Sequence, residues 1–591
     1  MRKRRENQGK SGSVAAFVGQ YLLMLVLVGV LAGLVTKSAM LHWADKAEIP
    51  ALPGENGAQT EVLPGGETEQ EDPADPSIIS PDLTAYAVES SKPENFLTET
   101  AVQVNGTVVE SYSPSREITF GKGSEYTDLK GIITFRGNNY RDTAEYGTHT
   151  LTNEKFGSKW VVNTGSLQAP DGNVWTGSGW TGSGWTGQPL IVEWEPELRQ
   201  QMNLYESAKK KEHLREVIYA CMDGYIYFLD MDTGAKTRDP LNVGYTFKGT
   251  ASLDPRGYPL LYVGAGYHSM AGNSRAFVIS LIDGKILYTF GNGDEFAKRQ
   301  WPMFDGSALV DAETDTLIYP GENGILYLIH LNTTYDSKAG TISIDPDEVV
   351  KWRYATNRND RYWLGMESSP VVWNGYVILA DNGGNLMCVD LNTLETIWVQ
   401  DTLDDTNCTP VLEVEDGHPY VYVSTSFHLG WRSSTTATIP VWKIDAVNGE
   451  VIWHTDYTCY SVSGVSGGTQ GTIALGKNSL SDRIFVAVSR TPDAGTGILA
   501  ALDKNTGETI WQFNSKVYSW SSPVDFYDSE TGKGYLIYTT SGGYIYLLDG
   551  ETGEILDSMD LEGNIEASAV VYDNKVVVGH RKCKIFGIDL T

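Results

Sequence analysis

Short segments in which apolar and polar residues alternate recur through most of the chain. The clearest of them continue with Asp, a few turn residues, Thr-Gly or an equivalent, and a second apolar run that often ends on Trp, as in ILAALDKNTGETIW, which ends at Trp511. Alternation with a period of two predicts half-buried β-strands, and a glycine in the turn supplies the positive φ that a tight hairpin needs. The pattern therefore predicts strand–turn–strand units.

Eight copies of this unit align on the Asp position or its equivalent. The eight marker residues are Asp230, Ser280, His330, Asp390, Asp445, Asp503, Asp549 and Asp589. They lie 40 to 60 residues apart, which suits units of four short strands that bury their faces only when neighbouring units stack on them. We therefore predict an all-β, eight-bladed β-propeller over residues 116–591. The Asp is expected to bind turn amides, and the Trp to pack between adjacent sheets.

The chain reaches Thr591 inside the eighth unit, so the last blade needs a final strand from elsewhere. The segment KWVVNTG, at residues 159–165, has strand character and precedes the first blade. We expect it to pair with the last blade, because this pairing would close the ring and remove exposed sheet edges.

A different pattern stands at the N-terminus. Residues 14–35 are 22 consecutive uncharged residues, which as a helix would span the bilayer core of about 30 Å. Five Lys and Arg residues precede this run, so the positive-inside rule predicts a cytoplasmic tail (1–13), an uncleaved transmembrane signal anchor (14–36) and an extracytoplasmic remainder. A cleaved signal peptide is the alternative, but the run is long for one and no A-x-A site closes it. The sequence predicts a single-pass protein of the cell membrane.

Composition separates the anchor from the repeats. Residues 37–115 are rich in Pro, Gly, Glu and Asp, which predicts a disordered acidic linker that holds the propeller away from the membrane. The net charge of -30 argues against a nucleic-acid partner, because such binding needs Lys and Arg to replace phosphate counterions. The five cysteines form no CxxC spacing, so no zinc or redox motif is indicated.

Two motifs carry a family resemblance. The pattern A-x-D-x-x-T-G-x-x-x-W, matched from Ala501 to Trp511, and the segment FRGNNYRDT at residues 135–143 resemble the quinoprotein-like eight-bladed propellers. This superfamily contains pyrroloquinoline quinone dehydrogenases and a non-catalytic lipoprotein of bacterial outer-membrane assembly. The resemblance covers about residues 130–591. The dehydrogenases usually carry two adjacent cysteines beside the quinone, whereas this chain has no Cys-Cys pair and no C-x-x-C-H motif. The resemblance thus implies the non-catalytic, membrane-anchored branch, without pyrroloquinoline quinone.

Propellers usually bind ligands at the mouth of the central channel, which is lined by the loops before each innermost strand. Aligning these loops places one residue of each blade on a common ring: Thr186, Lys248, Asp305, Glu367, Asn407, Gly468, Trp520 and Glu566. Three carboxylates and an amide are ligands that suit Ca²⁺ or a polar small molecule, and Lys248 can neutralise one carboxylate. A hydrated rim without a ligand is the alternative. The candidate ligand-binding residues are Lys248, Asp305, Glu367, Asn407, Trp520 and Glu566.

Two segments interrupt the repeats. Trp175, Trp180 and Trp185 recur every five residues in a Gly- and Ser-rich stretch, a spacing that predicts a loop. Its rings either contact a glycan or a partner protein, or fold back onto the first blade. Residues 195–215 predict a charged helical insertion with three consecutive lysines at 209–211, which form a solvated surface or contact a partner.

Taken together, these patterns predict an extracytoplasmic binding or scaffold module for envelope proteins or polymers such as polysaccharide, with no catalytic residue nominated. The alternative is a pyrroloquinoline-quinone-dependent dehydrogenase, or another enzyme with a site at the channel mouth. Triads are spatial arrangements, so the sequence leaves this alternative open.

Overall fold

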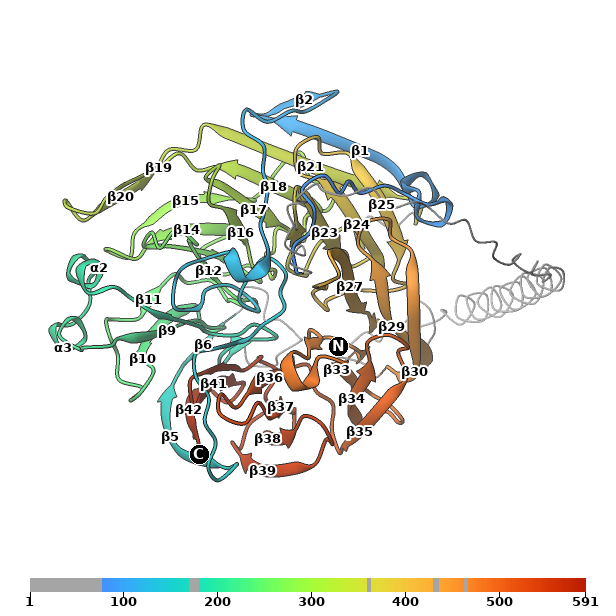
Figure 1. The fold of residues 1–591 in the computed structure, drawn as a ribbon. Coiled ribbons are helices and arrows are strands. Elements are labelled where there is room, and N and C mark those ends of the chain that lie inside the picture. Colours follow the sequence, from blue (N-terminus) through green and yellow to red (C-terminus); the bar gives the residue numbers. More distant parts are fainter. Residues whose placement is uncertain (1–76, 169–179, 359–362, 429–434, 462–465) are drawn as a thin grey trace, which may run out of the picture. The chain divides into compact units, whose positions relative to one another are not determined.

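The computed structural model describes residues 77–168, 180–358, 363–428, 435–461 and 466–591. Their secondary structure is almost entirely β, and eight antiparallel sheets follow one another around a central axis (Figure 1). The prediction of an eight-bladed propeller is confirmed. The predicted tail and anchor lie outside the described residues. Among the residues that are described, none of the helices has both the length and the apolar character required to cross a bilayer.

The first four blades follow the order of the chain. Blade one contains β8 (Leu190–Glu193), β9 (Arg215–Ala220), β10 (Tyr225–Asp230) and β11 (Leu241–Asn242), with β3 (Gly131–Ile132) beside β8. Blade two contains β12 (Ser252–Leu253), β13 (Leu260–Gly264), β14 (Ala276–Ser280) and β15 (Ile286–Phe290). Blade three contains β16 (Leu309–Asp311), β17 (Thr316–Pro320), β18 (Ile325–His330), β21 (Glu348–Thr356), β1 (Leu97–Val104) and β2 (Thr107–Val109). Blade four contains β22 (Val371–Trp373), β23 (Tyr376–Ala380), β24 (Asn385–Asp390) and β25 (Thr396–Asp401).

The other four blades complete the ring. Blade five contains β26 (Val411–Glu415), β27 (His418–Ser424), β29 (Thr436–Asp445) and β30 (Val451–Tyr460). Blade six contains β28 (Ser426–Phe427), β31 (Gly467–Gly468), β32 (Ala474–Leu475), β33 (Arg483–Ser489), β34 (Gly497–Asp503) and β35 (Thr509–Ser515). Blade seven contains β36 (Val524–Tyr527), β37 (Gly534–Thr539), β38 (Tyr544–Asp549) and β39 (Ile555–Asp560). Blade eight contains β40 (Val570–Tyr572), β41 (Lys575–His580), β42 (Lys584–Leu590), β5 (Phe156–Asn163) and β4 (Glu145–Tyr146).

The remaining elements are short. Two hairpins stand outside the blades, one formed by β6 (Ser166–Leu167) and β7 (Trp180–Thr181), the other by β19 (Thr333–Asp336) and β20 (Thr341–Ile344). The second hairpin projects from the outer side of the ring (Figure 1). The described helices are α2 (Pro196–Gln201), α3 (Glu206–Lys209) and the 3₁₀ turns η1 (Glu89–Ser91), η2 (Pro93–Asn95), η3 (Gly123–Glu125) and η5 (Asn478–Leu480).

The repeated Asp and Trp have the structural roles that their pattern predicted. Asp503 ends the third strand of blade six, and its Oδ1 accepts hydrogen bonds from the amides of Asn505 and Thr506, both at 2.9 Å. Trp453 of blade five donates its indole N–H to the carbonyl of Lys504, at 2.8 Å. Its ring lies against Gly507, where a Cβ would lie only 2.6 Å from the ring, so there is no room for a side chain. The turns of blades five and seven likewise receive Trp398 and Trp511 of the preceding blade.

The ring is completed by β5, whose antiparallel partner is β42 from the opposite end of the chain. The register pairs Trp160 with Gly587. The Trp160 indole donates to the carbonyl of Met231 in blade one, at 2.8 Å, and its ring packs on Gly234. Trp160 thus makes the same contact between blades eight and one that Trp453 makes between blades five and six.

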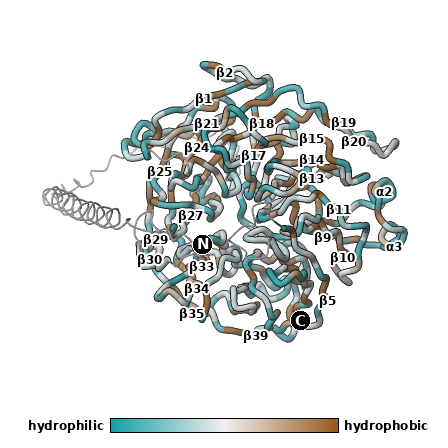
Figure 2. The backbone as a smooth tube through the Cα atoms, turned by 180° about the vertical axis from the view of Figure 1, so that it is seen from behind, coloured by the Kyte–Doolittle hydropathy of each residue, from teal (hydrophilic) through white to brown (hydrophobic). Residues whose placement is uncertain are grey.

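Apolar residues are spread around the whole ring (Figure 2). Separate buried clusters lie between neighbouring blades; one of them joins Trp373 and Trp398 of blade four to Trp442 of blade five. This follows from the strand pattern, because each sheet has two apolar faces and needs a neighbour on both sides.

A segment spanning residues 131–146 crosses one end of the propeller. The guanidinium of Arg141 donates to the carbonyls of Pro370 in blade four and Ser307 in blade three, at 2.9 Å each. Arg136 reaches the carbonyl of Pro523 before blade seven, at 3.0 Å. Both arginines are fully buried. This plug segment, which includes the motif FRGNNYRDT, ties the innermost strands together.

The predicted linker boundary at residue 115 is wrong. Strand β1 pairs with β21 from Leu97 to Val104, and its hairpin partner β2 widens blade three to six strands. The residues of β1, LTETAVQV, include β-branched and apolar side chains that suit an added edge strand. The acidic composition of the preceding residues concealed this short strand in the sequence.

Candidate binding site at the mouth of the central channel

A polar cavity lies on the propeller axis, where the loops before the innermost strands meet. Loops from blades one to seven line it, and Phe135 of the plug segment contributes to its wall. Of the ring residues expected from the sequence, Thr186, Asp305, Glu367 and Asn407 line this cavity. The aligned residues of blades one, three, four and five thus meet in one cavity.

In blade six the cavity is lined by a different residue from the one that the alignment predicted. The cavity is lined there by Gln470, and Asn407 donates its amide N–H to the Gln470 Oε1, at 2.8 Å. The expected residue, Gly468, instead belongs to β31, where it pairs with Ser426 and Ser489. The loop TQGTIA lacks the Ser-Pro or Thr-Pro pair present in blades four, five and seven, and the alignment was displaced there by two residues.

The cavity carries an acidic cluster next to one lysine. Asp305, Glu322 and Glu367 each offer a carboxylate oxygen, and these oxygens lie within 4.8 Å of one another. Lys248 Nζ lies 2.6 Å from Asp305 Oδ2. Asn382 donates to Glu367 Oε2, at 3.0 Å. The cluster thus combines three carboxylates with one lysine ammonium group, which pairs with Asp305.

Glu322 was not among the residues expected from the sequence. It lies between β17 and β18, in the Gly-rich turn PGENG. The equivalent turn of blade four, DNGG, contributes Asn382 to the same cluster. The recurrence of this turn was visible in the sequence. Only the closed ring shows that the position occupied by Glu322 and Asn382 reaches the axis.

Burial governs the charge of the cluster. Burial and the neighbouring Asp305 charge raise the pKa of Glu322 from 4.5 to about 7. Burial also raises the pKa of Glu367 well above its usual range, with Glu322 as the next contributor. For Lys248, burial acts against the charged form, but the surrounding carboxylates raise its pKa overall. The cluster therefore retains protons near neutral pH.

Aromatic side chains cover one side of the mouth. The ring centroids of Trp185 and Trp520 lie 5.6 Å apart in a stacked arrangement, and Trp180 meets Trp185 edge-on at 5.9 Å. Arg581 lies over the Trp185 ring, 5.1 Å from its centroid. Trp180 and Trp520 are only 3% and 5% exposed, so these rings fold onto the propeller. The third tryptophan of the loop, Trp175, lies outside the described residues.

The last ring residue, Glu566, belongs to this aromatic side. Its carboxylate pairs with Arg581 Nη1 at 2.8 Å and accepts from the Tyr518 hydroxyl at 3.1 Å. Glu566 is thus engaged within the protein, apart from the acidic cluster.

The lysines at 209–211 do not form a free basic surface. Lys211 Nζ lies 2.6 Å from carboxylate oxygens of both Asp230 and Asp232. Lys209 and Lys210 both lie within 4 Å of Glu206. The predicted helical insertion is present as the short helices α2 and α3; Lys211 is paired with two carboxylates, whereas Lys209 and Lys210 share Glu206.

Parts of the chain match known proteins in sequence. Residues 495–591 match the family described as outer membrane protein assembly factor BamB. That match covers the repeats of blades seven and eight and part of blade six. The chain is an eight-bladed β-propeller whose C-terminal repeats are similar to this family.

Two curated relatives match the chain over part of their length. BamB of Kangiella koreensis is 23% identical over 218 residues, which are 36% of this chain and 48% of that protein. The β-alanine-activating enzyme of Danio rerio is 31% identical over 96 residues, 16% of this chain and 8% of that protein. The chain thus matches less than half of either relative.

Two solved structures are similar to this chain in fold. BamB from Moraxella catarrhalis is 16% identical, with a TM-score of 0.42, and the alignment covers 63% of this chain and 91% of that one. The quinohemoprotein alcohol dehydrogenase ADHIIG from Pseudomonas putida HK5 is 10% identical, with a TM-score of 0.49. The alignment covers 78% of this chain and 80% of that one.

The acidic cluster at the channel mouth has oxygen ligands that suit a hard cation. Asp305 Oδ1 and Glu322 Oε1 are buried and accept no hydrogen bond from the described residues. Carboxylate oxygens are the ligands that Ca²⁺ prefers, and waters commonly complete its shell. Carboxylate oxygens of Asp305, Glu322 and Glu367 would hold such an ion, while Asp305 Oδ2 stays paired with Lys248. These residues fit a cation that stays partly hydrated.

We expect the stability of the protein to depend on the charge of Glu322. Because the pKa of Glu322 is higher in the folded protein than its ordinary value of 4.5, the folded state binds this proton more tightly than the unfolded state. The stability it contributes is fully present below about pH 4.5 and is lost as the pH rises through about 7. Between about pH 5 and pH 8, Glu322→Gln should therefore gain about 2–3 kcal/mol in unfolding free energy relative to the wild type.

Urea unfolding at a series of pH values checks this expectation, with Glu551→Gln on the exposed surface as the matched control. Parallel pH profiles of Glu322→Gln and wild type would contradict it. Millimolar Ca²⁺ should flatten the wild-type profile if the carboxylates bind the ion, because a bound cation favours the ionised form of Glu322.

Proposed function

We propose that this protein is a membrane-anchored, extracytoplasmic scaffold that binds envelope proteins through its propeller. The observation that carries the proposal is the match of residues 495–591 to the family of outer membrane protein assembly factor BamB. The basic tail and the apolar run at residues 14–35 support anchoring with the propeller outside the cytoplasm. An envelope polymer is the other ligand class that such a surface would bind.

The channel mouth is the proposed contact surface. The plug segment occupies one end of the axis, and the polar cavity with its three carboxylates lies beside Phe135 of that segment. The cavity, at about 20 Å³, is too small for a side chain, so a partner's Lys or Arg would lie at its rim and favour the ionised form of Glu322 through its charge. The net charge of -30 favours partners of opposite charge over the whole surface.

Site-specific photo-crosslinking of the full chain in its native membrane tests this proposal. A photoreactive residue at Thr186, which lines the mouth, should give a discrete crosslink to an envelope protein. The same residue at Ile510, which is 41% exposed on the outer strand β35, serves as the control. Equal crosslinking at both positions, or none at either, would count against a contact at the mouth.

The same preparation distinguishes the dehydrogenase alternative. Purified protein supplied with pyrroloquinoline quinone, Ca²⁺ and a panel of alcohols and sugars should reduce no artificial electron acceptor above background. Quinone-dependent turnover would overturn the scaffold proposal in favour of an enzyme.

A further inference from the structure

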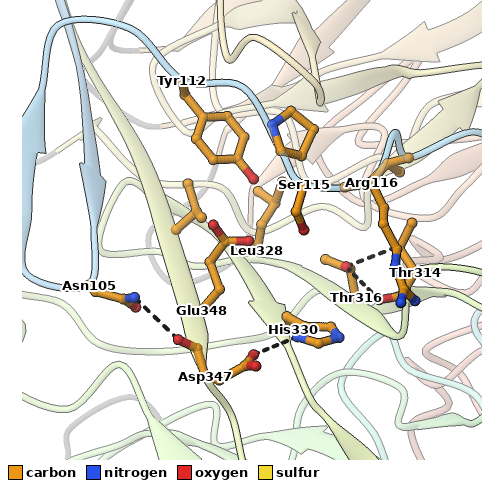
Figure 3. A pocket seen from close by; sticks show the side chains of 13 residues that line it. Asn105, Tyr112, Ser115, Arg116, Thr314, Thr316, Leu328, His330, Asp347 and Glu348 are labelled. Atoms are coloured by element: carbon orange, nitrogen blue, oxygen red, sulfur yellow. Dashed lines mark hydrogen bonds and ion pairs between the residues drawn. The ribbon is translucent and has the colours of Figure 1, made fainter.

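A second cavity lies away from the channel, between blade three and the chain segment that follows β2 (Figure 3). Its volume is about 320 Å³, which lies at the lower end of the range for small-molecule sites. Its lining residues include none of those that line the channel mouth. It is therefore a separate candidate site.

The strand register explains why a cavity forms at this place. Thr316, His330 and Glu348 are cross-strand neighbours on β17, β18 and β21, so their side chains form one polar row on a single face of blade three. The next row on the same face contains the buried Leu328 and Val350, which join the apolar cluster shared with blade four. The cavity begins where this apolar interface ends.

The roof of the cavity is held at both ends. Asn105 accepts a hydrogen bond from the amide of Val349 at 2.8 Å and donates to the carbonyl of Asp347 at 3.2 Å. At the other end, Ile118 exchanges two hydrogen bonds with the side chain of Asn392 in blade four, at 2.8 and 3.0 Å. Residues 105–118 thus form a strap over the row, anchored to blade three at one end and to blade four at the other.

Two opposite charges face this space without a partner. Among the described residues, neither the Arg116 guanidinium nor the Glu348 carboxylate makes an ion pair or hydrogen bond, whereas the adjacent His330 pairs with Asp347 at 2.5 Å. In Figure 3 the Tyr112 hydroxyl and the Glu348 carboxylate point toward the same space, and Arg116 extends from the strap on the other side. Burial, and next the Glu348 charge, raise the pKa of Tyr112, as expected for two neighbouring groups.

We propose that this cavity binds a small zwitterion of the amino-acid or dipeptide class. The ligand ammonium binds Glu348 and the Tyr112 hydroxyl, and the ligand carboxylate binds Arg116, which presents a planar pair of donors suited to it. The Leu328 side chain provides an apolar surface for the ligand side chain. A zwitterion satisfies both charges at once, whereas a singly charged ligand leaves one of them without a partner.

Calorimetric titration of the full chain with alanyl-alanine tests the proposal. We expect saturable binding below about 10 mM, weakened roughly tenfold by either Glu348→Gln or Arg116→Gln. The control is Glu117→Gln, an exposed neighbour on the strap that does not line the cavity and should bind as the wild type does. N-acetylated alanyl-alanine and alanyl-alanine amide each lack one charge and should bind roughly tenfold more weakly to the wild type.

The discriminating result is the pairing of probe and variant. The acetylated probe should be insensitive to Glu348→Gln, and the amide probe insensitive to Arg116→Gln, because each lacks the group that the substituted residue would bind. Absence of alanyl-alanine binding at about 10 mM, equal binding of all three probes, or binding unchanged in both variants would overturn the proposal. Crosslinking at the channel mouth is independent of each of these outcomes.

Discussion

Replacement of Arg141 by Met should lower the free energy of unfolding by about 3–5 kcal/mol. The Arg141 side chain is fully buried and donates to the carbonyls of Phe135, Ser307 and Pro370 and to the Thr134 hydroxyl. Burial lowers the pKa of the guanidinium to about 9, so the native structure holds the charge at a cost that these acceptors offset. Methionine fills similar space but leaves the carbonyls without a donor.

Urea unfolding monitored by tryptophan fluorescence measures this effect. Arg116→Met is the matched control, because Arg116 is exposed and makes no hydrogen bond or ion pair within the described residues; we expect a change below about 0.5 kcal/mol there. Equal midpoints for the two variants would show that the plug segment does not stabilise the ring.

Replacement of Trp160 by Ala should cost about 2–4 kcal/mol and should specifically weaken ring closure. Trp160 lies on β5, which pairs with β42 in blade eight. Its indole N–H donates to the carbonyl of Met231 in blade one, at 2.8 Å. A Cβ on Gly234 would lie 2.7 Å from the Trp160 ring, so the two are in tight contact. Removing the ring therefore loosens the contact between the first and last blades at once.

Hydrogen exchange distinguishes local opening from general destabilisation. In Trp160→Ala, amides of β42 and β5 should exchange faster than those of β23 and β24 in blade four. Val161→Ala is the control on the same strand, since Val161 is 44% exposed. Deletion of residues 156–166 with an unchanged melting temperature would refute closure by β5.

The propeller itself was predictable because its signals are local and repeated. Asp503 accepts a hydrogen bond from the amide of Thr506 within one turn, which Gly507 completes. Trp453 of the preceding blade contacts this turn. A single copy of this motif is weak, but eight in phase require a closed stack of sheets. The strand character of residues 159–165 was equally local, and β5 covers most of them.

The channel mouth was predictable only in part. Glu367 and Asn407 were found because Ser-Pro or Thr-Pro marks the start of the innermost strand that follows each of them, and Asp305 because the similar segment GSALV follows it. Glu322 was missed because it reaches the axis from a turn between two other strands, and Gln470 because its loop lacks that signal. The alignment reports position along a blade, whereas membership of the cluster depends on the direction of each side chain.

The sequence by itself determined the repeat, the number of blades and the strands of which they consist, because these follow from contacts between residues close in the chain or one blade apart. Only the tertiary structure decided that residues 131–146 plug the axis, that β1 and β2 extend blade three, and that Arg116 and Glu348 share a cavity. Those contacts join residues separated by at least 166 positions, without a repeating signal. Their partners become neighbours only once the ring has closed.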